Sequence, residues 1–462
     1  MNHFGLKTIF TSEKEITKDN IISIIENAMP IFLENQKQIK ELKDIFVGNQ
    51  EILQRQNDKT STNEKFNINI LPTIVNTMAG LYLGEKIDYV YANIDADEKK
   101  KEDIAIINRY MRYSGDILCD KNALIEMLIS GIAYQFCAGD EEEPFMIANI
   151  PSENCFAIYN TNIGYPIIAT CVYSSIDNDN YTLTVFTKTD KIVLVTDKDG
   201  KLKIDIENSI PHECPKNPIQ VIKFNEYALS LVAQLESVQN AFNLAISDSI
   251  NAIIEQIRAM LVINGAEITK DDAKLAKETG VLNVTNPNGT PISTAYLSKP
   301  LDENINSLRT FLFDLALFMA GVPSQETGGS GNNGAVAMAS GFFGANISAY
   351  FNELEFQKPK QNQIDNAIEA LKRKGIIKSD ISSFDIQIRF DRNKLSSLKE
   401  NADALAVLLK CNIPPRDALK VAGIFSDADN IANEIENIKK TAINKIVDEV
   451  TKDEQSTQNQ MS

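Results

Sequence analysis

The chain has 462 residues, of which 43% are hydrophobic and 24% charged. This length and balance are typical of a folded globular chain with two or more packed modules, and they exclude a disordered or collagen-like protein. The 46 Lys and Arg residues against 63 Asp and Glu give a formal net charge of −17 and a pI near 4.8, the wrong sign for a protein that holds a nucleic-acid backbone tightly.

The N-terminal region is predicted to be mainly α-helical. Apolar residues recur every three or four positions between residues 20 and 57, and Pro30 predicts a break that divides this region into two helices. The same spacing predicts three further helices, over residues 68–84, 99–113 and 120–133.

From Phe145 to Phe224, short runs rich in Val, Ile, Thr and Tyr alternate with turn residues. This pattern predicts a small antiparallel sheet, in which Asp199-Gly200 forms a tight turn. The acidic residues 140–143 just before it resemble a metal site, but four adjacent acids cannot all converge on one ion, so we predict a solvated loop.

Apolar residues from 230 to 262 step by three or four without a slip, which predicts one long helix of roughly 48 Å ending before Gly265. Its opposite face carries few charges, so both faces are expected to contact protein. A mixed segment over residues 267–298 with turn signals follows, and then a second apolar helix over residues 303–320. Together they predict a helical hairpin with an elaborated tip.

A glycine-rich sequence, GVPSQETGGSGNNGA, follows this hairpin and predicts a mobile loop. Backbone amides in such loops can hold phosphates, but the loop lacks a Gly-Lys-Ser/Thr ending and follows a helix instead of a strand. A nucleotide site there has little support.

The C-terminal third is predicted to be helical with one strand. A helix begins near Ala335 and reaches Arg373 after a break near Pro359. A strand follows, with four apolar residues on one face: Phe384, Ile386, Ile388 and Phe390. Residues 396–450 are predicted as helices broken at 414–415 and at Gly423, and residues 453–462 as a disordered tail.

The sequence shows no pattern of catalytic or metal-binding residues. Six cysteines are scattered without C-x-x-C spacing, the two histidines are far apart, and neither H-E-x-x-H nor G-x-S-x-G occurs. Asp271-Asp272 could bind Mg²⁺, although adjacent acids at a helix start usually complement its dipole. We therefore expect reduced thiols, no metal, no cofactor and no enzymatic activity.

Two features concern location. The first fifteen residues lack a basic region followed by an apolar run, so we expect no secretory signal and a cytoplasmic origin. The most apolar stretch, residues 311–322, is too short to cross a bilayer, which needs ~20 residues. No contact with a membrane is expected.

Four blocks of the sequence are informative together. They are IVNTMAGLYLGEKI at 74–87; NPIQVIKFN at 217–225, with the long helix after it; residues 295–344, where a helix, a small-residue loop and an alanine-bearing helix follow each other; and residues 386–438. In this order they resemble the portal proteins of long-tailed phages of Gram-positive hosts. The first block departs from the family at Met78, where lysine is common, and at Glu85-Lys86 in place of Lys-Pro. The third block is the most specific.

The resemblance implies an α+β, mainly α fold with the portal architecture. Its parts would be a wing of helices and sheet (1–225), two stem helices (226–263 and 301–320), a small α/β clip (264–300), a tunnel loop (321–334), a tunnel helix with the return to the wing (335–395), and a helical crown with a disordered tail (396–462).

The resemblance also implies a function. The chain would form a ring of about twelve copies at the capsid vertex, made in the host cytoplasm and placed in the virion. The ring would conduct double-stranded DNA during packaging and ejection without binding it tightly. Its partners would be the terminase motor, the head-tail connector, and the scaffolding and major capsid proteins.

Two sets of site residues follow from the same resemblance. The tunnel loop would place ten residues along the DNA channel: Gln325, Glu326, Thr327, Gly328, Gly329, Ser330, Gly331, Asn332, Asn333 and Gly334. The clip would dock partners through six residues: Asp271, Asp272, Lys274, Asn286, Asn288 and Thr290. Within the loop, Glu326 would repel DNA, or it is simply a solvated acid.

Two other functions remain open from the residues alone. A non-viral helical scaffold or adaptor explains the long helix, although its apolar spacing is not a strict heptad and the mixed excursion is unexplained. A nucleotide-dependent enzyme would have to use the glycine-rich loop.

Overall fold

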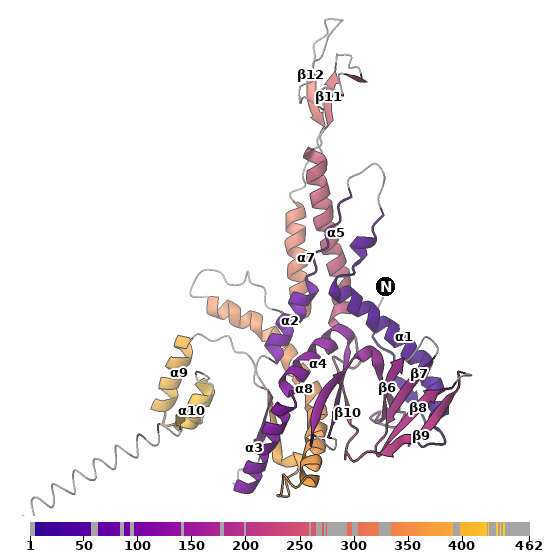
Figure 1. Ribbon diagram of the computed structural model, residues 1–462. Helices are drawn as coiled ribbons and strands as arrows, with labels where there is room; N and C mark the ends of the chain where they lie inside the picture. The colour runs from indigo at the N-terminus through magenta and orange to yellow at the C-terminus, as the bar shows by residue number, and fades with distance from the viewer. Residues whose placement is uncertain are drawn as a thin grey trace, which may run out of the picture. The chain divides into compact units, whose positions relative to one another are not determined.

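The computed structural model (Figure 1) is α+β, about 53% helix and 21% strand, as predicted. It describes residues 5–56, 63–83, 87–92, 97–139, 143–175, 180–197, 200–257, 260–264, 270–271, 274, 293–297, 304–322, 334–390, 398–422, 424, 431–432, 435 and 438. The chain divides into two compact units, Met1–Asn393 and Lys394–Ser462.

The first unit begins with a short strand and one long helix, α1 (Ile21–Val47), which contains Pro30. The predicted break at this proline is therefore wrong. Pro30 is exposed, while Ile25 before it and Phe32 after it are both buried in the same core. Burial on both sides of the proline outweighs its cost of ~3 kcal/mol to a helix.

A six-stranded sheet packs against α1, in the order β1-β5-β6-β7-β8-β9. Only β1 is parallel to its neighbour, and the other pairs are antiparallel. The strands are β1 (Ile9–Thr11), β5 (Cys155–Asn160), β6 (Ile167–Ser175), β7 (Tyr181–Phe186), β8 (Asp190–Thr196) and β9 (Leu202–Pro211). Alternate residues such as Leu183 and Val185 point into the core beneath α1, as the two-residue period of a strand requires.

A second sheet, in the order β10-β3-β4, makes the prediction of one sheet over 145–224 wrong in extent. Its strands are β3 (Ile132–Ala138), β4 (Met146–Ile150) and β10 (Ile219–Lys223). Strand β3 begins directly after α4 (Asp116–Ser130), so the predicted helix to residue 133 is too long. Gly131 ends the helix with φ +83°, and a Cβ there would overlap the carbonyl oxygen of Ala228.

Helices form the core next to this sheet. They include α2 (Leu71–Tyr82), α4, α5 (Leu231–Ile257) and α7 (Asn304–Ala320), while α3 (Glu98–Tyr113) packs in a separate cluster. The predictions of α2, α3 and α7 are confirmed within a few residues. Helices α5 and α7 run side by side (Figure 1), with the rings of Phe242 and Phe313 6.4 Å apart.

The long helix predicted to reach residue 262 ends at Ile257 instead, and Met260–Asn264 forms strand β11. This strand pairs antiparallel with β12 (Ser293–Leu297). A continuous apolar run such as MLVIN fits a helix or a strand by periodicity alone. The distant partner strand decides between them.

Helix α8 (Gly334–Arg373) is continuous through Pro359, so the break predicted there is also wrong. Strand β13 (Ile386–Phe390) follows and pairs with β2 (Ile87–Tyr91). Phe384 was predicted on the apolar face of this strand, but it lies in a turn before it and is 87% exposed.

The second unit contains α9 (Leu398–Lys410) and α10 (Pro415–Ala422). The predicted break at residues 414–415 is confirmed. The predicted break at Gly423, the disordered tail, the Asp199 half of the tight turn and acidic residues 140–142 lie outside the described residues.

Candidate subunit interface

The residues predicted to line a tunnel or dock partners lie mostly outside the described part of the chain. This holds for 325–333 of the predicted loop, and Gly334 is the first residue of α8. Of the predicted docking residues, Asp271 and Lys274 are helical and exposed, while Asp272, Asn286, Asn288 and Thr290 also lie outside. The described structure therefore does not bring these two sets together.

Helix α7 has two apolar faces. One face packs in the core through Leu312, Ala316 and Ala320. The other exposes Leu308, Phe311 and Phe318, at 47%, 60% and 82%. These three lie at a spacing of three and seven residues, so they form one stripe along the helix.

The charge content of α7 agrees with a second buried face. Only Arg309 and Asp314 are charged among its seventeen residues. A helix that faces water on one side normally carries charged residues there.

Helix α8 repeats this arrangement in its first half. Ile347, Tyr350, Phe351 and Leu354 are exposed at the spacing of one helix face. No charged residue occurs from Gly334 to Asn352. On the opposite side Ala349 and Phe356 pack in the same core as α7.

The two stripes belong to neighbouring elements. Gly321, just after α7, lies so close to α8 that a Cβ there would be 3.1 Å from the Ser348 hydroxyl oxygen. Helix α5 adds exposed Leu244 and Ile253. Large exposed apolar side chains on neighbouring helices are typical of protein–protein contact surfaces. We call the exposed apolar residues of α5, α7 and α8 the apolar surface.

A closed network of four buried polar side chains fixes α8 next to this surface. Lys360 forms an ion pair with Asp120 of α4, and its Nζ also donates to Gln363 Oε1 at 2.8 Å. Gln363 donates to Gln135 Oε1 at 2.8 Å, and Gln135 donates to Asp120 Oδ1 at 3.0 Å. All four side chains are buried, and each finds its hydrogen-bond partner within this network, as buried polar groups require.

Asp116 lies one helical turn before Asp120 on α4 and is also buried. Burial raises the pKa of Asp116, and the negative charge of Asp120 raises it further, although Lys360 opposes both effects. One lysine therefore serves two neighbouring carboxyl groups, of which Asp120 holds the ion pair.

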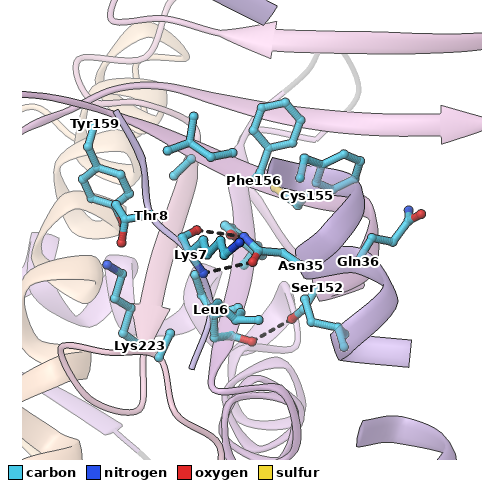
Figure 2. Close-up of a pocket in the computed structure, with 17 residues that line it drawn as sticks. Leu6, Lys7, Thr8, Asn35, Gln36, Ser152, Cys155, Phe156, Tyr159 and Lys223 are labelled. Atoms are coloured by element: carbon cyan, nitrogen blue, oxygen red, sulfur yellow. Dashed lines mark hydrogen bonds between the residues drawn. The ribbon is translucent and has the colours of Figure 1, made fainter. Parts of the chain in front are cut away.

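The cavity in Figure 2 lies where the N-terminal segment meets α1 and β5. Its volume is about 30 Å³, room for about one water molecule. Asn35 holds the extended backbone here, accepting from Lys7 N at 2.9 Å and donating to Lys7 O at 2.8 Å. Lys223 lies over the ring of Tyr159, 4.5 Å from its centre, and burial lowers the pKa of Lys223. This cavity belongs to packing rather than to chemistry.

Among the described residues, no group of three or more His, Cys, Asp or Glu side chains is placed to hold a metal ion. No helix in the described part is long and apolar enough to cross a membrane.

Residues 28–446 match the sequence model of one protein family, described as phage portal protein, SPP1 Gp6-like. No curated protein matches the chain. Because the match covers most of the sequence, the chain belongs to this portal family of tailed phages, a structural family whose members are virion components that act in DNA packaging.

Proposed function

We propose that the chain assembles into a closed ring at the capsid vertex and that the ring is a conduit for double-stranded DNA during packaging and ejection. The observation that carries this proposal is the second apolar face of α7, where Phe311 and Phe318 are exposed in the single chain. In a closed ring each subunit also packs against its neighbours, so a stem helix needs one apolar face for its own core and another for a neighbouring subunit.

The predicted regions gain support in outline. The sheets and helices within 1–225 would form the wing, and α5 and α7 the stem. The β11–β12 pair between them would belong to the clip, α8 would be the tunnel helix, and residues 396–462 the crown. The succession of α5, paired strands and α7 supports this assignment because it places a small sheet at the tip of a helical hairpin.

We further propose that residues 325–334 face the DNA and that the clip, with Asp271 and Lys274 exposed, docks the terminase motor and the head-tail connector. The acidic composition supports a conduit without tight binding. A protein gains affinity for DNA when its Lys and Arg side chains contact phosphates and release counterions. This chain, of net charge −17, has fewer Lys and Arg than acidic residues.

The test is the mass of the assembled protein. Native mass spectrometry of the wild type should show a closed ring near twelve copies. Phe318→Ser should raise the concentration at which half the chains are assembled by about tenfold or more, because burying a Phe side chain contributes ~1.5–3 kcal/mol.

Ile206→Ser is the matched control. Ile206 is 77% exposed on β9, an edge strand of the six-stranded sheet, and is not part of the apolar surface. The Ile206→Ser substitution should leave both the mass of the assembly and the thermal unfolding unchanged. A wild-type protein that stays monomeric at every concentration and salt, or an Ile206→Ser variant as defective as Phe318→Ser, would contradict the proposal.

A further inference from the structure

An extended segment, residues 63–70, lies along α5 and is held by a polar stripe on that helix. We call this segment the strap. Alternate backbone amides of the strap donate to side chains that are four residues apart on α5. The bonds are Glu64 N to Asn251 Oδ1 (2.8 Å), Phe66 N to Ser247 Oγ (3.0 Å), Ile68 N to Asn243 Oδ1 (3.0 Å) and Ile70 N to Gln239 Oε1 (3.0 Å).

The same side chains bind the strap carbonyls in return. Gln239 donates to Ile68 O at 2.8 Å, and Asn251 donates to Glu64 O at 3.2 Å. Four residues of helix rise ~6.0 Å, and two residues of strand advance ~6.7 Å. Because these repeats nearly match, side chains of α5 take the place of a neighbouring antiparallel strand.

The opposite edge of the strap carries the backbone amides that do not bind α5. In a strand, successive backbone N–H groups point to opposite sides, so those of Lys65, Asn67 and Asn69 point away from α5. Within the described part of the chain these three amides donate no hydrogen bond. Phe66 and Ile68 beside them are 37% and 43% exposed.

The strap is nevertheless held firmly. Asn67 Nδ2 donates to Gly48 O at 2.6 Å, and Asn69 Nδ2 donates to Phe46 O at 2.7 Å. Lys65 Nζ donates to Leu53 O at 2.9 Å. The segment is thus extended, with one satisfied edge and one open edge.

Open strand edges are usually protected against pairing by charges, bulges or proline. Strand β9, at the outer edge of the six-stranded sheet, has such protection: Lys203, an irregular register opposite Val193, and Pro211. The strap carries two charged residues, Glu64 and Lys65, but residues 66–70 include none, and the strap contains no proline. The edge formed by residues 66–70 is therefore less protected than that of β9, which indicates that assembly covers it.

We propose that the open edge of the strap accepts an extended segment of a second copy of this chain by strand addition. This inference rests on the proposed ring. The second copy is the occupant because the strap lies on α5, whose Leu244 and Ile253 belong to the apolar surface. Main-chain pairing needs no particular side chains, and it repeats identically between every two neighbours of a ring.

Residue-resolved hydrogen exchange tests this pairing in the full chain. In the unassembled Phe318→Ser variant, the amides of Phe66, Ile68 and Ile70 should be protected, and those of Lys65, Asn67 and Asn69 should exchange freely. In the wild-type ring, the second set should become protected by at least tenfold. If these amides exchange equally fast in a ring of the expected mass, the ring stands and strand addition is wrong.

A pair of substitutions at one position gives the second measurement. Lys65→Pro removes an outward N–H, whereas Lys65→Ala removes the same side chain and keeps the N–H. Losing one intermolecular hydrogen bond should raise the half-assembly concentration of Lys65→Pro about tenfold above that of Lys65→Ala. Equal effects of the two substitutions would overturn the proposal, and a wild type that does not assemble would instead refute the ring.

Discussion

Replacing Lys360 by methionine should destabilise the chain severely without touching its surface. Lys360 and its partner Asp120 are both buried, at 0% and 4% exposure. Methionine keeps much of the side-chain volume but leaves the Asp120 carboxylate without its cation and Gln363 Oε1 without its donor. Breaking a buried ion pair in this way costs ~3–5 kcal/mol of the free energy of unfolding.

The assay is urea unfolding of the full chain, followed by circular dichroism. With a denaturant slope of about 3 kcal/mol per molar, a loss of ~3–5 kcal/mol lowers the urea midpoint by about 1 M or more. The matched control is Lys358→Met, an exposed lysine two residues earlier on α8, which should change the free energy by less than ~0.5 kcal/mol.

The double variant Asp120→Asn with Lys360→Met separates the charge from the packing. Asparagine still accepts the hydrogen bond of Gln135, and of the two buried carboxyl groups that Lys360 serves only that of Asp116 remains. It should therefore be more stable than Lys360→Met alone. A Lys360→Met midpoint within about 0.3 M of the wild type would refute the reasoning, because it would mean that the buried carboxylate needs no cation.

Two further predictions concern protons and thiols. Burial raises the pKa of Glu153, but the ion pair with Lys43, at 2.5 Å, a backbone hydrogen bond and the charge of Lys40 together outweigh burial and lower this pKa below its usual value. As the pH falls, the Glu153 carboxylate binds a proton in the unfolded state, at its usual pKa, before it does so in the folded state, at its lowered pKa. The stability that this group contributes is therefore fully present above pH ~4.5 and is lost as the pH falls through the lowered pKa. The urea midpoint of Lys43→Met should therefore fall less steeply with acid than that of the wild type, and parallel curves would refute this. All six cysteines are free, Cys411 is exposed, and burial raises the pKa of Cys155 well above that of an ordinary thiol. A thiol reagent at neutral pH should modify Cys411 first, and Cys411→Ser should remove the fast phase, while modification of Cys155 before unfolding would contradict the structure.

The helices with a regular apolar period could be predicted from the sequence, because that period is a local property. This holds for α2, α3 and α7. The breaks predicted at Pro30 and Pro359 failed because tertiary packing continues on both sides of each proline. Around Pro359, Phe356 is buried before it and Lys360 after it, so the flanking contacts hold the helix together.

The candidate interface was predictable in part. The scarcity of charge on the stem helices indicated two protein-facing sides, and the exposed stripe of α7 agrees with that expectation. The buried polar network around Lys360 was missed, since its members Asp120 and Lys360 are 240 residues apart. Neither residue carries a local signal that distinguishes it from a surface charge.

The strap was missed for a related reason. The spacing of Gln239, Asn243, Ser247 and Asn251 by four residues is visible in the sequence, but it is typical of any polar helix face. Only the alternation of bonds to residues 64, 66, 68 and 70 shows that this face binds a strand. A polar stripe at this spacing on an otherwise apolar helix is the signal that could have indicated it.

In the first unit some polar side chains are buried and some large apolar side chains are exposed, which is unusual for an isolated chain. Polar side chains such as Lys360 and Gln363 are buried and hold α8 in one position, while Phe318 and Phe351 face outward. Buried polar groups with every partner present fix a unique arrangement more than they add stability. Exposed apolar groups gain free energy only when a second surface covers them. In the proposed assembly, burial of this apolar surface contributes its favourable free energy, so the stability of the protein should rise with its concentration.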